Sequence, residues 1–150
     1  MKPDGIFFDA FHPGQSFETD RRTITEADHV NFTTAFGFFE PLFMDQAYVE
    51  ANTPYPGRVV PGALTFSVAE GLTILSGIIH GTGLALLGVE LDILKPVFIN
   101  DTIRVIIEVT GKRETRKPVQ GIVSFLHHVQ NQADMTVMTY KVKRMIRRTR

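Results

Sequence analysis

The chain has 150 residues, 43% of them hydrophobic, and its 16 basic residues equal its 16 acidic ones. This is the size of one ordinary domain, and the balanced charge excludes a global field that would recruit nucleic acid or an acidic membrane surface. The absence of cysteine excludes thiolate nucleophiles, disulfides and cysteine-ligated metals, and suits a reducing cytoplasm, where we expect the protein.

The first elements are short. Residues 1–20 are rich in aromatics, proline and glycine, which predicts an irregular or briefly extended segment, and they lack the apolar core of a signal peptide. Thr25 then offers an N-cap oxygen, with Asp28 three residues later in the first turn. This pattern predicts a helix from about Glu26 to Ala35.

A second short helix and a loop are predicted next. Gly37 suits the end of the first helix and Pro41 suits a first helical turn, so a helix is expected over residues 41–51. Residues 53–62 hold three prolines and two glycines, which predicts an ordered loop.

The segment from Gly62 to about Ile79 has apolar residues on nearly every helical face. A helix of this kind is enclosed by other elements. The apolar run continues to residue 89, but Glu70, His80 and six glycines interrupt it, so we expect no membrane span.

From Leu84 onward the hydrophobic period changes to two. Residues 89–93, 103–109 and 123–129 each alternate apolar and polar side chains, which predicts strands. The sequence NQAD at 131–134 predicts a hairpin turn before a last strand at 135–144. Helices followed by strands with short connections predict an α+β fold, in which an antiparallel sheet wraps against a helix.

Four segments resemble the MaoC-like dehydratase family, to which the R-specific enoyl-CoA hydratases belong. They are RTITEADHVNF (22–32), GRVVPGALTFSVAEGL (57–72), LDILKPVFINDTIRVIIEVTGKRETRK (91–117) and GIVSFLHHVQNQADMTVMTYKVKR (121–144). The resemblance covers about residues 14–144 of one domain spanning 1–150. It implies a hotdog fold, with a curved antiparallel sheet around a long central helix, usually paired into a dimer. It also implies acyl thioesters of coenzyme A or of a carrier protein as ligands.

The loop after the first helix departs from the family pattern. In active hydratases it resembles G-D-x-N-P-x-H-x-D, where the Asp and His hold and activate the reacting water. The matching stretch here is GFFEPLFMD (37–45), with Phe38 in place of that Asp and Phe43 in place of that His. A phenyl ring neither accepts nor donates a proton, so the usual pair cannot operate. We expect Phe38 and Phe43 to shape the pocket instead.

Three residues remain as candidates for the chemistry. Glu40 is a carboxylate inside the altered loop, and its alternative role is to cap the helix that starts at Pro41. Asp45 matches an acid that relatives often keep, and its alternative role is also structural. The resemblance implies that the backbone N–H of Gly62, at a helix start, binds the thioester oxygen as charge develops on it.

Other basic and histidine residues could bind phosphates or a metal ion. Arg113, Arg116 and Lys117 are candidates for binding coenzyme A phosphates, with a solvated turn as the alternative. A second basic group at the end of the chain could also meet these phosphates, with a solvated tail as the alternative: Lys143, Arg144, Arg147, Arg148 and Arg150. His29 is interpreted as a surface or capping residue. His127 and His128 alternate along one strand and therefore point to opposite faces. We expect neither a metal site nor a cofactor.

Three functions stay open. The first is a hydratase or dehydratase, or a hotdog thioesterase, that uses Glu40 or Asp45. The second is a non-catalytic acyl-thioester-binding subunit that forms a heterodimer with a hotdog chain carrying the Asp–His pair. The third is a dimeric domain whose groove binds an apolar ligand unrelated to coenzyme A. A homodimer is the expected assembly for the first.

Overall fold

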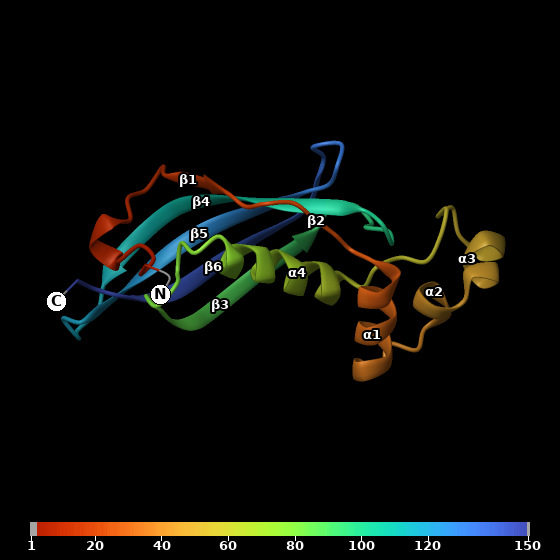
Figure 1. The fold of residues 1–150 in the computed structure, drawn as a ribbon, viewed down its shortest axis with the longest axis horizontal. Coiled ribbons are helices and arrows are strands. Elements are labelled where there is room, and N and C mark those ends of the chain that lie inside the picture. The colour runs from red at the N-terminus through yellow and green to blue at the C-terminus, as the bar shows by residue number, and fades with distance from the viewer. Residues whose placement is uncertain (1–2, 150) are drawn as a thin grey trace.

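A computed structural model describes residues 3–149 as one antiparallel sheet with the longest helix along one of its faces (Figure 1). The strand order is β1-β4-β5-β6-β3, and β2 also pairs with β4. The strands are β1 (Ser16–Glu18), β2 (Arg22–Thr23), β3 (Gly83–Ile93), β4 (Thr102–Glu114), β5 (Gln120–Gln130) and β6 (Thr136–Arg147). The helices are the short 3-10 helix η1 (Phe8–Ala10), α1 (Glu26–Phe36), α2 (Pro41–Met44), α3 (Gln46–Asn52) and α4 (Gly62–Leu75). The predicted α+β class is confirmed.

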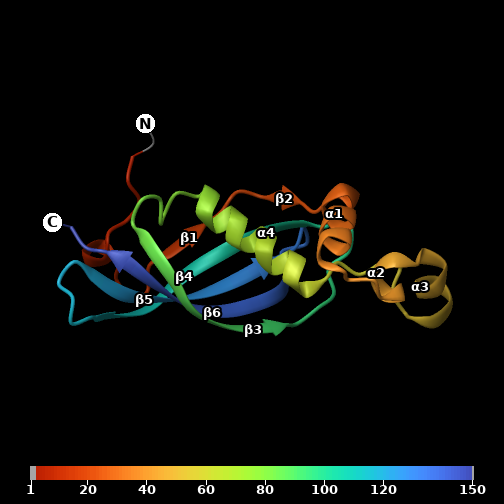
Figure 2. The same ribbon diagram turned by 90° about the horizontal axis from the view of Figure 1, so that it is seen from below.

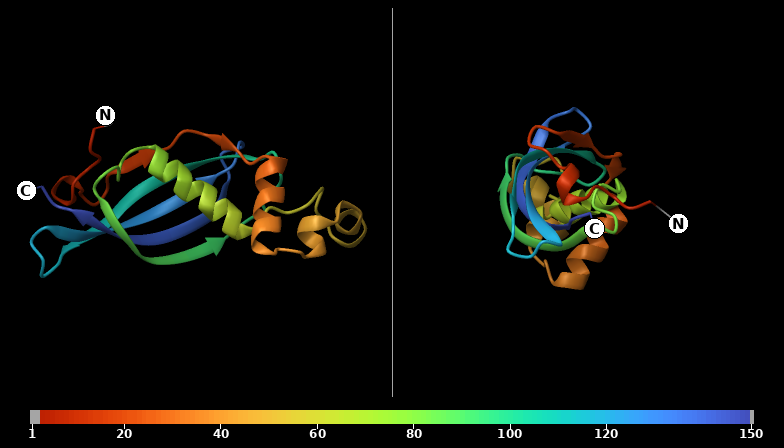
Figure 3. Two further views of the ribbon diagram at one scale, coloured as in Figure 1. Left: turned by 60° about the horizontal axis from the view of Figure 1, so that its bottom comes forward. Right: turned by 90° about the vertical axis from the view of Figure 1, so that its left-hand side faces the viewer.

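The sheet is curved, and α4 lies along its concave face (Figure 2). The end-on view in Figure 3 shows the strands curling around this helix. α1, α2 and α3 gather beyond one end of the sheet, and both chain termini lie at the other end. The arrangement is the curved sheet around a central helix that the sequence led us to expect.

Alternating burial along the long strands explains how the sheet and α4 pack. β4 points Ile103, Val105, Ile107 and Val109 inward, and all four are fully buried. From α4, four apolar side chains enter the same core: Leu64, Val68, Ala69 and Leu72. One contiguous apolar core therefore joins the helix to the sheet.

Three predicted boundaries were wrong. The single helix expected over 41–51 is split in two, because Asp45 has extended dihedrals (φ −118°, ψ 99°) and caps α3. α4 ends at Leu75 rather than near Ile79, because Gly77 takes a left-handed conformation (φ 84°) that breaks the helix. β6 continues three residues past Arg144 because Met145, Ile146 and Arg147 still pair with neighbouring strands. No helix within residues 3–149 is long and apolar enough to cross a membrane.

A polar cluster links α4 to β6 inside the core. The Arg144 guanidinium donates to Glu70 Oε1 at 2.6 Å, and the Tyr140 hydroxyl donates to the same oxygen at 2.8 Å. Burial, and then the Glu70 carboxylate, raise the pKa of Tyr140. The cluster fixes the position of the middle of α4 along β6.

His127 of β5 lies beside this cluster. Its side chain is fully buried, and its ring centroid is 4.4 Å from that of Tyr140. Neither ring nitrogen has a hydrogen-bond partner among the described residues. Burial lowers the pKa of His127 to about 3, and the charges of Arg144 and His128 add to the effect. His128 points to the other, partly exposed face, as predicted.

Acidification should destabilise the folded protein because the buried His127 resists protonation. The ordinary histidine pKa is 6.5, so between pH 6.5 and about pH 3 the unfolded chain binds a proton here that the folded chain does not. The stability is present above pH 6.5 and is lost as the pH falls, by about 2 kcal/mol between pH 7.5 and pH 5. Urea unfolding at those two pH values should show a smaller difference for His127→Leu than for the wild type. His128→Gln should keep the wild-type difference, and a His127→Leu variant that also kept it would contradict this assignment.

Candidate functional site

The loop of residues 37–45 is built by its own turn chemistry. Gly37 ends α1 in the left-handed conformation (φ 74°), which glycine adopts at low cost. Pro41 opens α2 at a position where no backbone N–H is needed. Asp45 closes α2 and accepts a hydrogen bond from Tyr48 N at 2.9 Å as the cap of α3. The loop thus turns twice within nine residues and faces the start of α4.

Aromatic rings fill the inside of this loop. Tilted ring contacts join Phe36 to Phe32, Phe32 to Phe38 and Phe38 to Phe43, with centroid distances of 5.1, 5.2 and 6.1 Å. Phe38 and Phe43 are half-buried, whereas Phe36 and Phe39 are mostly exposed. Phe38 and Phe43, the residues predicted to replace the Asp and His of the family pattern, are therefore part of an aromatic row.

His29 holds this loop from α1, so its interpretation as a surface or capping residue was wrong. The side chain is fully buried, and Nε2 lies 2.7 Å from the carbonyl oxygen of Phe43. A carbonyl can only accept, so Nε2 donates. Nδ1 has no partner among the described residues. The contact spans 14 positions of sequence, which is why local spacing did not reveal it.

Glu40 and Asp45 occupy different environments. Glu40 precedes α2, but its exposed side chain makes no cap hydrogen bond. Asp45 is also exposed, and its carboxylate already accepts the bond that caps α3. Of the two carboxylates, Glu40 is the one whose oxygens no cap interaction occupies.

A cavity of about 210 Å³ lies between the loop and the first turn of α4. Phe43 and Gly62 both line it, and a Cβ placed on Gly62 would collide with the side chain of Ile93. Its other walls come from Leu42, Val59, Val60, Thr65, Ile93, Lys95, Pro96, Val97, Val137 and Met138. The structure thus brings two sequence-predicted site residues, Phe43 and Gly62, to one small apolar space, and no carboxylate or histidine is among its described lining.

Two lining residues were missed by sequence reasoning. Thr65 is 1% exposed and one turn along α4 from Gly62. Lys95, whose amide donates to Val137 O at 3.1 Å, is the one charged residue among the described residues of the lining. A threonine three positions after a helix-starting glycine was a readable signal for Thr65, because residues three apart share a helix face.

The predicted phosphate-binding residues lie elsewhere. Arg113 is near the far end of β4, and Arg116 and Lys117 are in the exposed turn that follows it. Eight strand positions separate Arg113 from Val105, which lies at the α1 end, so the distance is about 26 Å. Within one chain these three residues do not meet Gly62.

The second basic group is largely engaged. Arg144 bonds Glu70, Arg147 pairs with Asp4 at 3.2 Å, and Arg148 pairs with Asp9 at 2.7 Å. Arg150 lies outside the described residues.

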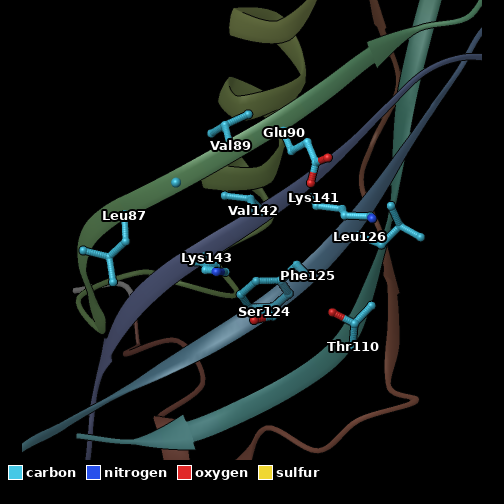
Figure 4. Close-up of a pocket in the computed structure, with 11 residues that line it drawn as sticks. Leu87, Val89, Glu90, Thr110, Ser124, Phe125, Leu126, Lys141, Val142 and Lys143 are labelled. Atoms are coloured by element: carbon cyan, nitrogen blue, oxygen red, sulfur yellow. The ribbon is translucent and has the colours of Figure 1, made fainter.

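A larger cavity, about 490 Å³, lies on the outer face of the sheet, away from α4 (Figure 4). Lys141, Lys143, Ser124 and Leu126 line it alongside β3 residues. Because these side chains point away from the core, this cavity is separate from the one at Gly62. No cluster of His, Asp and Glu within residues 3–149 is arranged to hold a metal ion.

The sequence profile of the MaoC like domain matches residues 9–131. The chain belongs to the MaoC-like dehydratase family. A protein named MaoC from Klebsiella aerogenes is 38% identical over 118 residues, which cover 78% of this chain and 34% of that protein. The (R)-specific enoyl-CoA hydratase of Aeromonas caviae is 37% identical over 86 residues, covering 57% of this chain and 61% of that one. This MaoC-like chain thus matches about a third of the first relative's length and under two thirds of the second's.

Solved structures of relatives agree with the fold of this MaoC-like chain. A monoamine oxidase regulatory protein from an Archaeoglobus species superposes with a TM-score of 0.90 at 28% identity, covering 100% of this chain and 99% of that one. A Mycobacterium tuberculosis protein with a double hotdog fold superposes with a TM-score of 0.85 at 22% identity, covering 97% of this chain and 45% of that one. The fold is therefore the hotdog fold.

The His29 contact gives a stability prediction for this MaoC-like chain. His29→Leu removes the donor to Phe43 O, so the free energy of unfolding should fall by about 1–3 kcal/mol in urea titrations. Asn31→Leu, on the exposed side of the same helix, should change it by less than about 0.5 kcal/mol. Equal effects of the two substitutions would show that His29 does not hold the loop.

Proposed function

We propose that this chain binds acyl thioesters, with the thioester at the first turn of α4 and the start of the acyl group in the apolar cavity. The observation that carries the proposal is the geometry of that cavity, where a helix N-terminus opens at Gly62 among apolar walls. The first backbone N–H groups of a helix lack intrahelical acceptors, and the helix dipole favours negative charge there. A thioester carbonyl oxygen accepts hydrogen bonds and carries partial negative charge, so it would be stabilised at this helix N-terminus.

The related (R)-specific enoyl-CoA hydratase supports a coenzyme A thioester as the ligand class. Lys95 is the one charged residue among the described lining of the cavity, so it lies at the thioester end of such a ligand. Arg113, Arg116 and Lys117 lie toward the other end of the sheet and stay the predicted phosphate-binding residues, because the pantetheine arm separates the phosphates of coenzyme A from its thioester.

We propose further that the loop of this chain shapes the pocket and does not transfer protons. Phe43 stands at the cavity where the family pattern has His, and Phe38 stacks behind it. Neither ring can activate water. The function best supported is therefore an acyl-thioester-binding subunit, with the hydratase or dehydratase chemistry supplied by a partner hotdog chain that carries the Asp–His pair.

One observation favours a second candidate, catalysis by Glu40. Its carboxylate is exposed and does not cap α2, so it is free to act as a general base in a hydratase or a thioesterase. Asp45 has less freedom for this role because it caps α3.

Purified chain should bind saturated acyl-CoA esters and neither hydrate enoyl-CoA nor release free thiol. Binding is measured as the rise in melting temperature with ligand. Gly62→Ala should reduce that rise, because the added methyl group meets the end of the Ile93 side chain, which then has to turn within the cavity. Gly71→Ala, on the same helix with open space around it, should keep it. No rise for the wild type with any acyl-CoA would refute thioester binding.

Turnover decides between the two candidates. If the purified chain is active, Glu40→Gln should reduce turnover by about 100-fold or more, whereas Glu50→Gln, an exposed carboxylate on α3, should leave it unchanged. Activity that survives Glu40→Gln would exclude the second candidate. Activity that appears only after addition of a dyad-bearing hotdog chain would support the first.

We also propose that β3 is the edge at which a second hotdog chain pairs. β3 has one sheet neighbour, β6, so its other edge is unpaired among the described residues. It exposes a row of apolar side chains, with Leu84, Leu86, Leu87, Val89 and Ile93 each 41–58% exposed. A long, apolar, unpaired edge is a template for strand pairing.

The molecular mass in solution tests whether β3 forms the interface with a second chain. Sedimentation equilibrium of the purified wild type, alone or with its partner chain, should give a two-chain species. Leu87→Asp should shift it to the single-chain mass. Val119→Asp is the matched control, because Val119 is 62% exposed in the β4–β5 turn, away from β3. A Leu87→Asp protein that remained paired would place the interface elsewhere.

A further inference from the structure

Thr65 carries a buried hydroxyl group that the fold does not use. The residue is 1% exposed, and its Oγ1 has no hydrogen-bond partner among the described residues. Leaving a buried hydroxyl unbonded is unfavourable, and most such groups in folded proteins have a partner. The Thr65 hydroxyl is therefore available to bind a ligand.

Other hydroxyl groups of the same helix show what is unusual about it. Thr73 Oγ1 donates to Ala69 O at 2.9 Å, and Ser67 Oγ donates to Ala63 O at 2.8 Å. Both follow the usual pattern in which a helical hydroxyl bonds the carbonyl four residues earlier. For Thr65 that carbonyl belongs to Pro61, which already accepts from Leu64 N at 2.9 Å and Thr65 N at 3.1 Å. The hydroxyl of Thr65 is thereby left available.

The position of Thr65 on α4 places its side chain at the candidate site. Residues three apart lie on one face of a helix, so Thr65 stacks one turn behind Gly62. Both residues line the cavity of about 210 Å³. The surrounding side chains are apolar apart from Lys95, so a ligand carbonyl that enters the cavity meets this hydroxyl as an available donor.

We propose that the Thr65 hydroxyl donates a hydrogen bond to the carbonyl oxygen of the bound thioester, alongside the backbone N–H at Gly62. This rests on the proposed acyl-thioester binding and adds a second, side-chain donor to it. A carbonyl oxygen has two lone pairs and accepts two such bonds. Both donors lie among apolar walls that include Phe43, and a hydrogen bond is strengthened in such surroundings. Thr65 is thus a thioester-binding residue that recognises the carbonyl rather than the acyl chain.

The test uses two probes that differ in the carbonyl alone. Butyryl-CoA is a thioester, and S-butyl-CoA is the corresponding thioether without the oxygen. Calorimetry should show that Thr65→Val weakens butyryl-CoA binding about tenfold, the loss expected for one hydrogen bond, and leaves S-butyl-CoA binding unchanged. Thr65→Ser, which keeps the hydroxyl group, should restore binding of butyryl-CoA.

Melting temperatures supply an independent readout. Thr65→Val removes an unbonded polar atom at nearly constant shape, so without ligand its melting temperature should be unchanged or higher than that of the wild type. Thr73→Val is the matched control, because it removes a bonded hydroxyl; it should lower the melting temperature and leave binding of both probes unchanged.

Each outcome has a distinct meaning. Equal affinity of wild type and Thr65→Val for butyryl-CoA would overturn the inference while leaving acyl-thioester binding intact. An equal loss for both probes, or a lowered melting temperature, would also overturn it by showing that Thr65 supports the fold. Failure of the wild type to bind either probe would overturn the proposed function itself, and this inference with it.

Discussion

The packing of α4 into the concave face of the sheet is the interaction on which the rest of the structure depends. Leu64, Val68 and Leu72 are 3–6% exposed in this contact, and burying such side chains stabilises a fold by about 1.5–3 kcal/mol each. The Glu70–Arg144 pair in the same interface contributes less net energy, because desolvation offsets much of its attraction. Apolar packing therefore holds the helix in place, and the polar cluster fixes its register against β6.

This packing decides where chemistry is possible. With α4 held along the sheet, its first turn at Gly62 is fixed at the end of the molecule where α1, α2 and α3 gather. The loop between α1 and α3 then closes over that turn, and the His29 bond to Phe43 O sets its depth. A helix N-terminus, an apolar cavity and an unused hydroxyl come together because three separate segments pack at one corner.

The cavity is suited to binding more than to proton transfer. Backbone N–H groups and the Thr65 hydroxyl are fixed dipoles that stabilise an oxygen without changing charge, whereas water activation needs a group that exchanges a proton. The described lining offers the first kind and, apart from Lys95, not the second. In the proposed function, the aromatic row around Phe38 and Phe43 shapes the binding cavity and takes no part in proton transfer.

Local chemistry made much of the fold predictable. The α1 boundaries followed from the Thr25 capping box and the Gly37 terminator, and the hairpin at 131–134 followed from its turn residues. Alternation along β4 and β5 gave the correct inward faces. The break at Asp45 was missed because a carboxylate suits either a helix interior near its start or a cap, and the choice depends on how α3 leaves the loop.

The sequence by itself determined the α+β class and most of the elements, and it predicted the replacement of the usual Asp–His pair, because these depend on residue identity and short-range spacing. Only the tertiary structure decided that His29 is buried beneath the loop, that the Thr65 hydroxyl has no partner within residues 3–149 and that Arg113 stands far from Gly62. These facts depend on which distant segments meet and on which hydrogen-bond acceptors are already occupied, and no local pattern in the chain encodes either.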